Sequence, residues 1–234
     1  MVAPVRPVRC GAGPTGPPAP HGPRAATAAQ PLRLFVTGDS MLESAGPMVV
    51  RKGGSKGRVD GCVDIRYSTG IVRPDYFDWA ANARARMAER NPEAVVMMVG
   101  GNDCQNMAVD GRVLTAASPE WTAEYQRRTA AIMAVYANGG ARRVYWVGMP
   151  IARSTKHTGC FRALDGALAR AAAAQRGVSY VDIWALFAPD GRYTDTIDGR
   201  RVRNSDGIHL SVAGAELLAG RLLSLLDADW RISR

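Results

Sequence analysis

The chain has 234 residues, of which 47% are hydrophobic and 22% are charged, so it is long and apolar enough to fold as one domain with a sizeable core. No stretch approaches the roughly 18 consecutive apolar residues that a membrane span needs, and the early arginines are not followed by the apolar run of a signal peptide. We therefore expect a soluble protein without a membrane span, cytoplasmic as the sequence stands and extracellular if an export signal precedes it.

The first 30 residues are rich in Pro, Gly and Ala and contain almost no large apolar side chains. Such a segment buries too little apolar surface to offset the entropy that it would lose on ordering. We predict a disordered tail over residues 1–30 and a folded domain over residues 31–234.

From residue 31 onward, short apolar runs alternate with amphipathic segments. Strands are predicted at 32–37, 59–66, 94–100, 142–150 and 178–184. Helices are predicted at about 40–50, 76–90, 118–140, 162–176 and 211–226. Strands that alternate with helices form parallel sheets that are covered on both faces. The sequence therefore predicts an α/β fold, a three-layer α/β/α sandwich around a five-stranded parallel sheet.

The formal net charge is +9, from 30 lysines and arginines against 21 acidic residues. An excess of arginine can follow from coding bias alone, or it can attract an anionic partner such as nucleic acid, a cell-wall polymer or lipid headgroups. The sequence has no zinc-finger spacing and no RNP-like motif. We therefore expect no nucleic-acid partner.

The four cysteines are too far apart in the sequence for a CxxC redox or metal motif. Cys10 falls in the predicted tail, whereas Cys62, Cys104 and Cys160 fall in loops or near strand ends. One disulfide among these three fits the pattern, and so do free buried thiols. The cysteines alone do not fix the compartment.

Ser40 follows the first predicted strand, in the sequence Gly38-Asp39-Ser40. Sites in parallel α/β sheets form beyond the carboxyl ends of the strands, and the start of the next helix offers unpaired N–H groups. Both features suit a serine that attacks a carbonyl and needs its oxyanion stabilised. A serine here is also a common helix cap, so the assignment depends on the rest of the chain.

Two other loops at the same predicted edge can supply oxyanion donors. Asn102 follows the third strand in the stretch "VGGNDCQNM", and its amide can donate to an oxyanion. Gly70 lies in "YSTGIVRPD", after the second strand, and can present its backbone N–H. Taken singly, both stretches are more typical of simple turns.

A possible acid–base pair precedes the last helix. Asp206 and His209 are three residues apart in "NSDGIHLS", so the carboxylate can orient the imidazole and stabilise its protonated form. The two other histidines are weaker candidates, since His21 lies in the predicted tail and His157 in the loop after the fourth strand. Alone, this pair would also fit an ordinary polar turn.

The four segments together resemble a known family. "GDS" (38–40), "STG" (68–70), "GGND" (100–103) and "DGIH" (206–209) look like the four sequence blocks of the SGNH hydrolases, also called GDSL-type esterases, and occur in the family's order. The resemblance covers about residues 32–226. The stretches "VYWVGMP" and "YVDIWALF" are similar to a bacterial subgroup labelled DUF459.

The resemblance implies a flavodoxin-like fold and a role for each matching residue. Ser40 matches the nucleophile, His209 the general base and Asp206 its partner. Gly70 and Asn102 match the residues that form the oxyanion hole together with the N–H of Ser40. No cofactor is implied, and no cluster of residues has the spacing of metal ligands, so we expect neither a cofactor nor a metal.

These residues predict a serine hydrolase that cleaves a carboxylic ester through an acyl-serine intermediate. The expected substrate is a short, acetyl-like acyl group on a carbohydrate or small molecule. A lysophospholipase, a thioesterase or an acyltransferase would use the same site. A binding module without catalysis, which engages an anionic polymer through the basic charge, is the alternative from another class, and the complete set of four motifs disfavours it.

Overall fold

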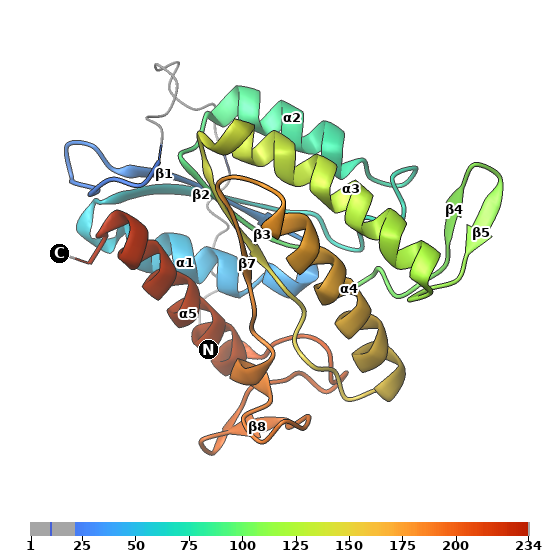
Figure 1. Cartoon of the computed structure of the whole chain (residues 1–234). Helices are drawn as coiled ribbons and strands as arrows, with labels where there is room; N and C mark the ends of the chain where they lie inside the picture. Colours follow the sequence, from blue (N-terminus) through green and yellow to red (C-terminus); the bar gives the residue numbers. More distant parts are fainter. Residues whose placement is uncertain (1–9, 11–21, 234) are drawn as a thin grey trace.

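The computed structural model describes residue 10 and residues 22–233 and centres on one sheet. Its five strands are parallel throughout, and helices pack on both faces (Figure 1). The strands are β1 (Leu32–Gly38), β2 (Val59–Ile65), β3 (Ala94–Met98), β6 (Arg143–Val147) and β7 (Val178–Val181). The prediction of an α/β/α sandwich with a five-stranded parallel sheet is confirmed.

The strand order is β2-β1-β3-β6-β7. The chain moves from β1 to the edge strand β2 and then returns past β1 to β3, where the direction of progress across the sheet reverses. The carboxyl ends of β1 and β3 therefore flank the topological switch point, which is where ligands bind in open α/β sheets.

Helices form the two outer layers. Helices α1 (Ala45–Gly53) and α5 (Val212–Trp230) pack together on one face (Figure 1). The other face carries α2 (Trp79–Arg90), α3 (Pro119–Ala137) and α4 (Thr155–Ala173), which contact one another in that order. None of the helices in the described part of the chain is long and apolar enough to cross a membrane.

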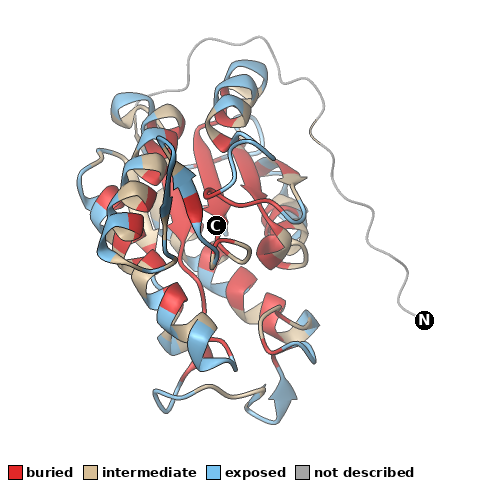
Figure 2. Ribbon diagram, turned by 90° about the vertical axis from the view of Figure 1, so that its right-hand side faces the viewer, coloured by how far each residue is buried: buried red, intermediate tan, exposed pale blue. Residues whose placement is uncertain are grey.

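The core follows from the apolar runs in the sequence. All five residues of β3 are buried, as expected for a central strand with helices on both sides. In Figure 2 the strands are mostly red, and the helices turn pale blue surfaces outward. Burial of the strands fixes the loops that follow them at one edge of the sheet.

The largest differences from the predicted helices are in the first and the fourth. The first predicted helix is divided into a short 3-10 turn, Ser40–Leu42, and α1. Helix α4 begins at Thr155, after the cap Ser154 whose hydroxyl accepts the N–H of His157. The helix starts earlier than predicted because this cap stabilises a polar first turn without an apolar pattern.

Two small hairpins have no counterpart among the predicted elements. One joins β4 (Met107–Val109) to β5 (Arg112–Leu114), and the other joins β8 (Thr196–Ile197) to β9 (Arg200–Arg201). Their strands have two or three residues each, too few to show an alternating pattern. The remaining 3-10 turns are Gly54–Lys56, Asn138–Gly140 and Ala185–Phe187.

Part of the predicted tail packs on the domain. Arg24 pairs with the carboxylate of Glu93, whose side chain is fully buried, at 2.8 Å. Ala26 is also buried, and its N–H donates to the carbonyl of Trp230. A buried carboxylate needs a partner, which explains why residues 22–30 are held against the domain. Residues 1–9 and 11–21 lie outside the described residues, so the tail stays a prediction there.

Asp165 is a buried carboxyl group between α4 and the sheet. Its Oδ1 accepts the N–H of Met149 at 2.8 Å. Burial raises the pKa of Asp165 to about 8, and the Met149 N–H opposes this shift only in part. The folded protein therefore holds a proton that the unfolded chain releases near pH 4.

This raised pKa predicts a pH-dependent stability. The contribution of Asp165 to the free energy of unfolding is fully present below about pH 4 and is lost as the pH rises through about 8. Asp165→Asn, which mimics the protonated acid, should unfold at the wild-type temperature at about pH 3.5, where Asp165 is largely protonated in both the folded and the unfolded state. At pH 8.5 it should unfold several degrees higher, since ~1 kcal/mol moves the midpoint by ~2–4 °C in a domain of this size. Thermal unfolding followed by circular dichroism measures both, and equal midpoints at pH 8.5 would contradict the assignment.

Candidate active site

Ser40 lies just beyond the carboxyl end of β1, at the switch point. Gly38 ends the strand, and a Cβ there would overlap the backbone carbonyl of Met98 in the neighbouring strand, so only glycine fits. Asp39 then caps the 3-10 turn by accepting the N–H of Met41 at 2.9 Å. The tight turn leaves Ser40 half-buried at the sheet edge.

The structure brings Ser40, His209 and Asp206 into one hydrogen-bonded chain. Ser40 Oγ lies 2.8 Å from His209 Nε2, and His209 Nδ1 lies 2.6 Å from Asp206 Oδ2. Ser40 and His209 are 169 residues apart in the sequence. This arrangement lets the imidazole accept the serine proton while the carboxylate stabilises the imidazolium.

The Asp206 carboxylate is fixed by its own loop. Its Oδ1 accepts the N–H groups of Ile208 and His209 at 2.8 and 3.0 Å. Burial raises the pKa of Asp206, but these backbone bonds and the bond to the His209 ring outweigh it and lower the pKa below its ordinary value. Asp206 therefore stays ionised, as the partner of an imidazolium must.

Asn102 and the Gly70 loop lie side by side. Asn102 Nδ2 donates to the carbonyl of Thr69 at 2.9 Å. A Cβ on Gly70 would overlap the Asp103 carboxylate, which explains the glycine at this position. Asn102 and Gly70 are thus adjacent.

Asp39 links the Ser40 turn to the loop that carries Asn102. Its Oδ2 accepts the N–H groups of Gly100 and Gly101 at 3.0 and 2.9 Å. Burial raises the pKa of Asp39 to about 6, although these backbone bonds oppose the shift. No sequence pattern marks this role of Asp39, because its partners are backbone N–H groups, which every residue type except proline has.

Asp103 holds the Gly70 loop in place in a similar way. Its carboxylate accepts the N–H groups of Ile71 and Val72 at 3.1 and 3.0 Å, and the hydroxyl of Tyr125 at 2.8 Å. Asp103 is fully buried, and burial raises its pKa. It follows Asn102 directly, so one short segment both supplies a possible oxyanion donor and fixes the neighbouring loop.

Arg203 supports the loop that carries His209. Its guanidinium donates to the carbonyls of Ile208 and Ile151 at 2.9 and 2.7 Å and lies over the ring of Phe187. Arg203 is fully buried, and burial lowers its pKa to about 10. No motif in the sequence marks this residue, which follows Arg200 and Arg201 and precedes the "DGIH" segment.

His157 does not join the site. It lies in the first turn of α4, not in a loop as predicted, and its ring packs against Phe161 with the centroids 6.0 Å apart. Within residues 22–233 and at Cys10, no group of three or more His, Cys, Asp or Glu residues is arranged to hold a metal ion.

All four cysteines form disulfides, Cys10–Cys62 and Cys104–Cys160. The sequence pattern fits one disulfide among Cys62, Cys104 and Cys160, or free thiols, and places Cys10 in the tail. That tail cysteine instead pairs with Cys62 on the edge strand. Cys104 follows Asp103 and ties the Asn102 loop to α4.

Removal of the Cys104–Cys160 bond should weaken both stability and the site. The Cys104→Ser/Cys160→Ser variant is expected to lose ~2–4 kcal/mol of unfolding free energy, and its turnover of an ester should fall because the Asn102 loop loses its tether. Cys10→Ser/Cys62→Ser is the matched control, with a similar loss of stability and a smaller loss of turnover. Denaturant unfolding and ester assays measure both, and an equal loss of turnover in the two variants would contradict the role of the tether.

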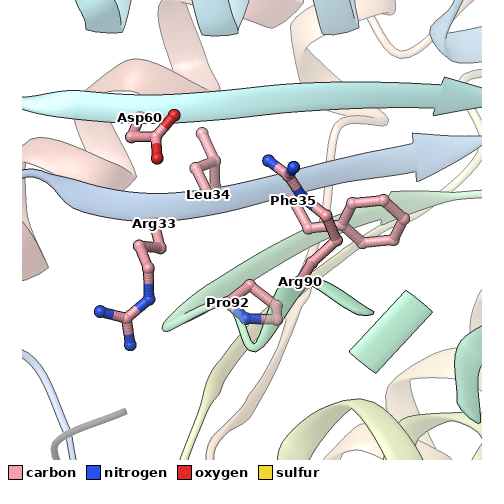
Figure 3. Close-up of a pocket in the computed structure, with 6 residues that line it drawn as sticks. All are labelled: Arg33, Leu34, Phe35, Asp60, Arg90 and Pro92. Carbon is pink, nitrogen blue, oxygen red and sulfur yellow. The ribbon is translucent and has the colours of Figure 1, made fainter. Parts of the chain in front are cut away.

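Two hollows, of about 10 and 550 Å³, lie at the opposite end of the sheet, and neither is lined by Ser40, Asp206 or His209. Figure 3 shows the smaller of the two. Its lining residues are Arg33, Leu34, Phe35, Asp60, Arg90 and Pro92. Arg33 lies near the start of β1 and Ser40 beyond its end, so the two are about 20 Å apart along the strand.

The fold is shared with several solved hydrolase and transferase structures. A carbohydrate esterase family 3 protein from Talaromyces cellulolyticus has a TM-score of 0.56 and 15% identity, covering 84% of this chain and 97% of its own. An alpha/beta hydrolase from the metagenome of Lake Arreo, Spain, has a TM-score of 0.61 and 16% identity, covering 86% and 95%. The catalytic domain of the Streptococcus pneumoniae peptidoglycan O-acetyltransferase A has a TM-score of 0.54 and 11% identity, covering 85% and 94%.

The sequence itself matches one family. No curated protein matches the chain. The family described as "Protein of unknown function (DUF459)" matches residues 33–225. This range contains β1, the Ser40 turn, both neighbouring loops and the segment with Asp206 and His209. The DUF459 part of the sequence resemblance is therefore confirmed, and the chain belongs to the DUF459 family.

Proposed function

We propose that this protein is a serine esterase of the SGNH type, with Ser40 as the nucleophile. One observation carries the proposal, the unbroken chain from Ser40 Oγ through the His209 ring to the Asp206 carboxylate. A polar surface turn has no need of such a chain across two loops. A module that only binds a polymer has no need of it either.

Ser40 Oγ forms a bond to the ester carbonyl carbon while His209 Nε2 accepts the hydroxyl proton. The bond from that carbon to the alcohol oxygen then breaks, and His209 returns the proton to the departing alcohol. Water next adds to the acyl-serine, again giving its proton to His209, and the acid leaves as Ser40 recovers the proton. Asp206 keeps the imidazole oriented throughout.

The N–H groups of Ser40 and Gly70 and the Asn102 amide form the oxyanion hole in this proposal. The Asn102 amide has two N–H bonds. One donates to the carbonyl of Thr69, which orients the group, and the other is left for the substrate. Asp39 and Asp103 hold the two loops that carry these donors.

Asn102→Ala tests the oxyanion hole. Turnover of p-nitrophenyl acetate should fall ~10²–10³-fold, mainly in kcat, because the lost donor acts on charge that develops in the transition state. Asn106→Ala is the matched control, since Asn106 is exposed in the same loop and bonds only the Ala116 N–H in the described structure. Equal, small losses in both variants would exclude Asn102 as an oxyanion donor.

A short acyl group on a carbohydrate is the proposed substrate. The side chains of His209 and Asp206 are 32% and 45% exposed, so the site is open to a bulky alcohol component. The similarity in fold to a carbohydrate esterase and to a peptidoglycan O-acetyltransferase domain supports the same choice. A lysophospholipase or thioesterase is a weaker alternative, since nothing in the sequence resembles a long hydrophobic lid.

Acyl transfer to a sugar hydroxyl is the second candidate. The same residues serve both reactions, with a sugar hydroxyl in the place of water in the second step. The fold similarity to the peptidoglycan O-acetyltransferase domain favours it specifically. Acetylated products that appear when xylotriose is added to an assay would identify transfer.

Both disulfides support an oxidising setting for the protein. Disulfides persist mainly in secreted and periplasmic proteins, and all four cysteines are paired. We therefore favour the extracellular alternative over the cytoplasmic one.

The proposed activity is tested with p-nitrophenyl esters of increasing chain length beside O-acetylated oligosaccharides. We expect turnover that is highest for acetate, with acetate released from the sugars. The chemistry uses no metal, so the rate should survive treatment with a chelator. Absence of turnover of every ester by the folded protein would refute the proposal.

A further inference from the structure

A loop beside the candidate site carries two exposed tyrosines. Within the described residues, Tyr67 and Tyr76 are the strongly exposed aromatic side chains, at 58% and 64%. Both lie between β2 and α2, in the segment that contains Gly70. Aromatic side chains are usually buried, so an exposed ring that also lines a hollow beside a site suggests a ligand that stacks on it.

Tyr67 lines a hollow of about 460 Å³ at the carboxyl end of β2. This volume falls within the ~300–1,000 Å³ that is usual for small-molecule sites. The other polar side chains of its wall are Glu43, Asp64, Arg66 and Arg86.

The hollow is continuous with the loops of the candidate active site. Glu43 is three residues after Ser40, and its N–H donates to the Ser40 carbonyl at 3.2 Å. The N–H of Arg66 donates to the carbonyl of Gly38 at 2.9 Å. Tyr67 is three residues before Gly70. The hollow therefore shares with the candidate active site the loops that follow β1 and β2.

The wall of the hollow combines charged side chains with the apolar side chains of Pro47, Val63 and Ile65, and the charged ones are held in place. Asp64 accepts from the guanidinium groups of Arg66 and Arg86 at 3.1 and 3.2 Å. The guanidinium of Arg66 also lies over the ring of Phe77, 5.5 Å from its centroid. Burial and the neighbouring Glu43 carboxylate raise the pKa of Tyr67, so its hydroxyl stays protonated beside that carboxylate.

This chemistry suits a ligand with many hydroxyl groups. Carboxylates accept hydrogen bonds from hydroxyls, guanidinium groups donate to their oxygens, and an aromatic ring covers the apolar face of a sugar.

We propose that the hollow formed by Glu43, Asp64, Arg66, Tyr67 and Arg86 is a subsite for a sugar unit of a carbohydrate ester, with Tyr67 as its stacking platform. The proposal rests on the esterase function proposed above. It assigns the recognition of the substrate to the loop after β2, on the side of the oxyanion donors.

The test compares O-acetylated xylotriose with p-nitrophenyl acetate, which has no sugar. In Tyr67→Ala, the ratio of kcat/KM for the sugar ester to kcat/KM for p-nitrophenyl acetate should fall about tenfold. The fall should come mainly from a higher KM for the sugar ester, because one stacking surface is lost. Tyr67→Phe keeps the ring and should stay within about twofold of wild type. Tyr76→Ala is the matched control, an equally exposed tyrosine of the same loop outside the hollow, and should leave the ratio unchanged.

Glu43→Gln provides a second variant, in which loss of a charged acceptor should lower the same ratio about threefold or more. An unchanged ratio in both Tyr67→Ala and Glu43→Gln would overturn the subsite, as would an equal fall in Tyr76→Ala. A wild-type protein that hydrolyses p-nitrophenyl acetate but not the sugar ester would also overturn it. Failure to hydrolyse either ester would instead refute the esterase function.

Discussion

Replacement of Ser40 by alanine is expected to abolish turnover of p-nitrophenyl acetate, with a fall of ~10³-fold or more. Loss of the nucleophile removes the acyl-serine route entirely and leaves only binding and the oxyanion donors. The comparison is made with purified protein in a spectrophotometric assay at saturating ester. Undiminished turnover in Ser40→Ala would eliminate the mechanism.

The fold should survive this change. The Ser40 hydroxyl contacts the His209 ring at the half-exposed edge of the sheet, and the turn itself is capped by Asp39. We therefore expect the unfolding temperature of Ser40→Ala to remain within a few degrees of wild type. A loss of activity with an unchanged unfolding curve assigns the effect to chemistry and not to folding.

Replacement of His209 by alanine is expected to cause a loss of similar size. The serine hydroxyl is a weak nucleophile without a base to accept its proton. Because Ser40 and His209 act as a unit, the Ser40→Ala/His209→Ala double variant should be no less active than either single variant. The same p-nitrophenyl acetate assay measures all three variants.

His157→Ala is the matched control for His209→Ala. His157 belongs to α4 and packs on Phe161, so its loss should leave turnover close to wild type. Additive losses in the double variant would indicate that His209 serves a separate purpose. Comparable losses in His157→Ala and His209→Ala would show that the assignment of the base is wrong.

The sheet could be predicted because its strands are buried apolar runs. A sequence such as Ala94–Met98 has no polar side chain to interrupt it, and burial on both faces is the only environment that suits it. The hairpins β4–β5 and β8–β9 could not be predicted in this way. Their short strands are largely exposed, as at Arg200–Arg201, and no periodicity marks them.

The side chains of the candidate site could be predicted, but their supports could not. Ser40, Asn102 and His209 each follow a strand or precede a helix in a recognisable motif. Asp39 and Arg203, by contrast, bind backbone groups from distant segments, so their roles depend on the folded arrangement. The same limit applies to the disulfides, since sequence spacing does not specify which cysteines meet.

Covalent labelling by a fluorophosphonate probe is the decisive test of Ser40 as an activated nucleophile. The probe reacts with a serine whose hydroxyl is activated by a base and whose oxyanion is stabilised. We expect mass spectrometry to find a single labelled peptide, modified at Ser40 in the wild type and unmodified in His209→Ala. Folded wild-type protein that remains unlabelled, or that is labelled at another serine, would contradict the assignment of Ser40 as the nucleophile.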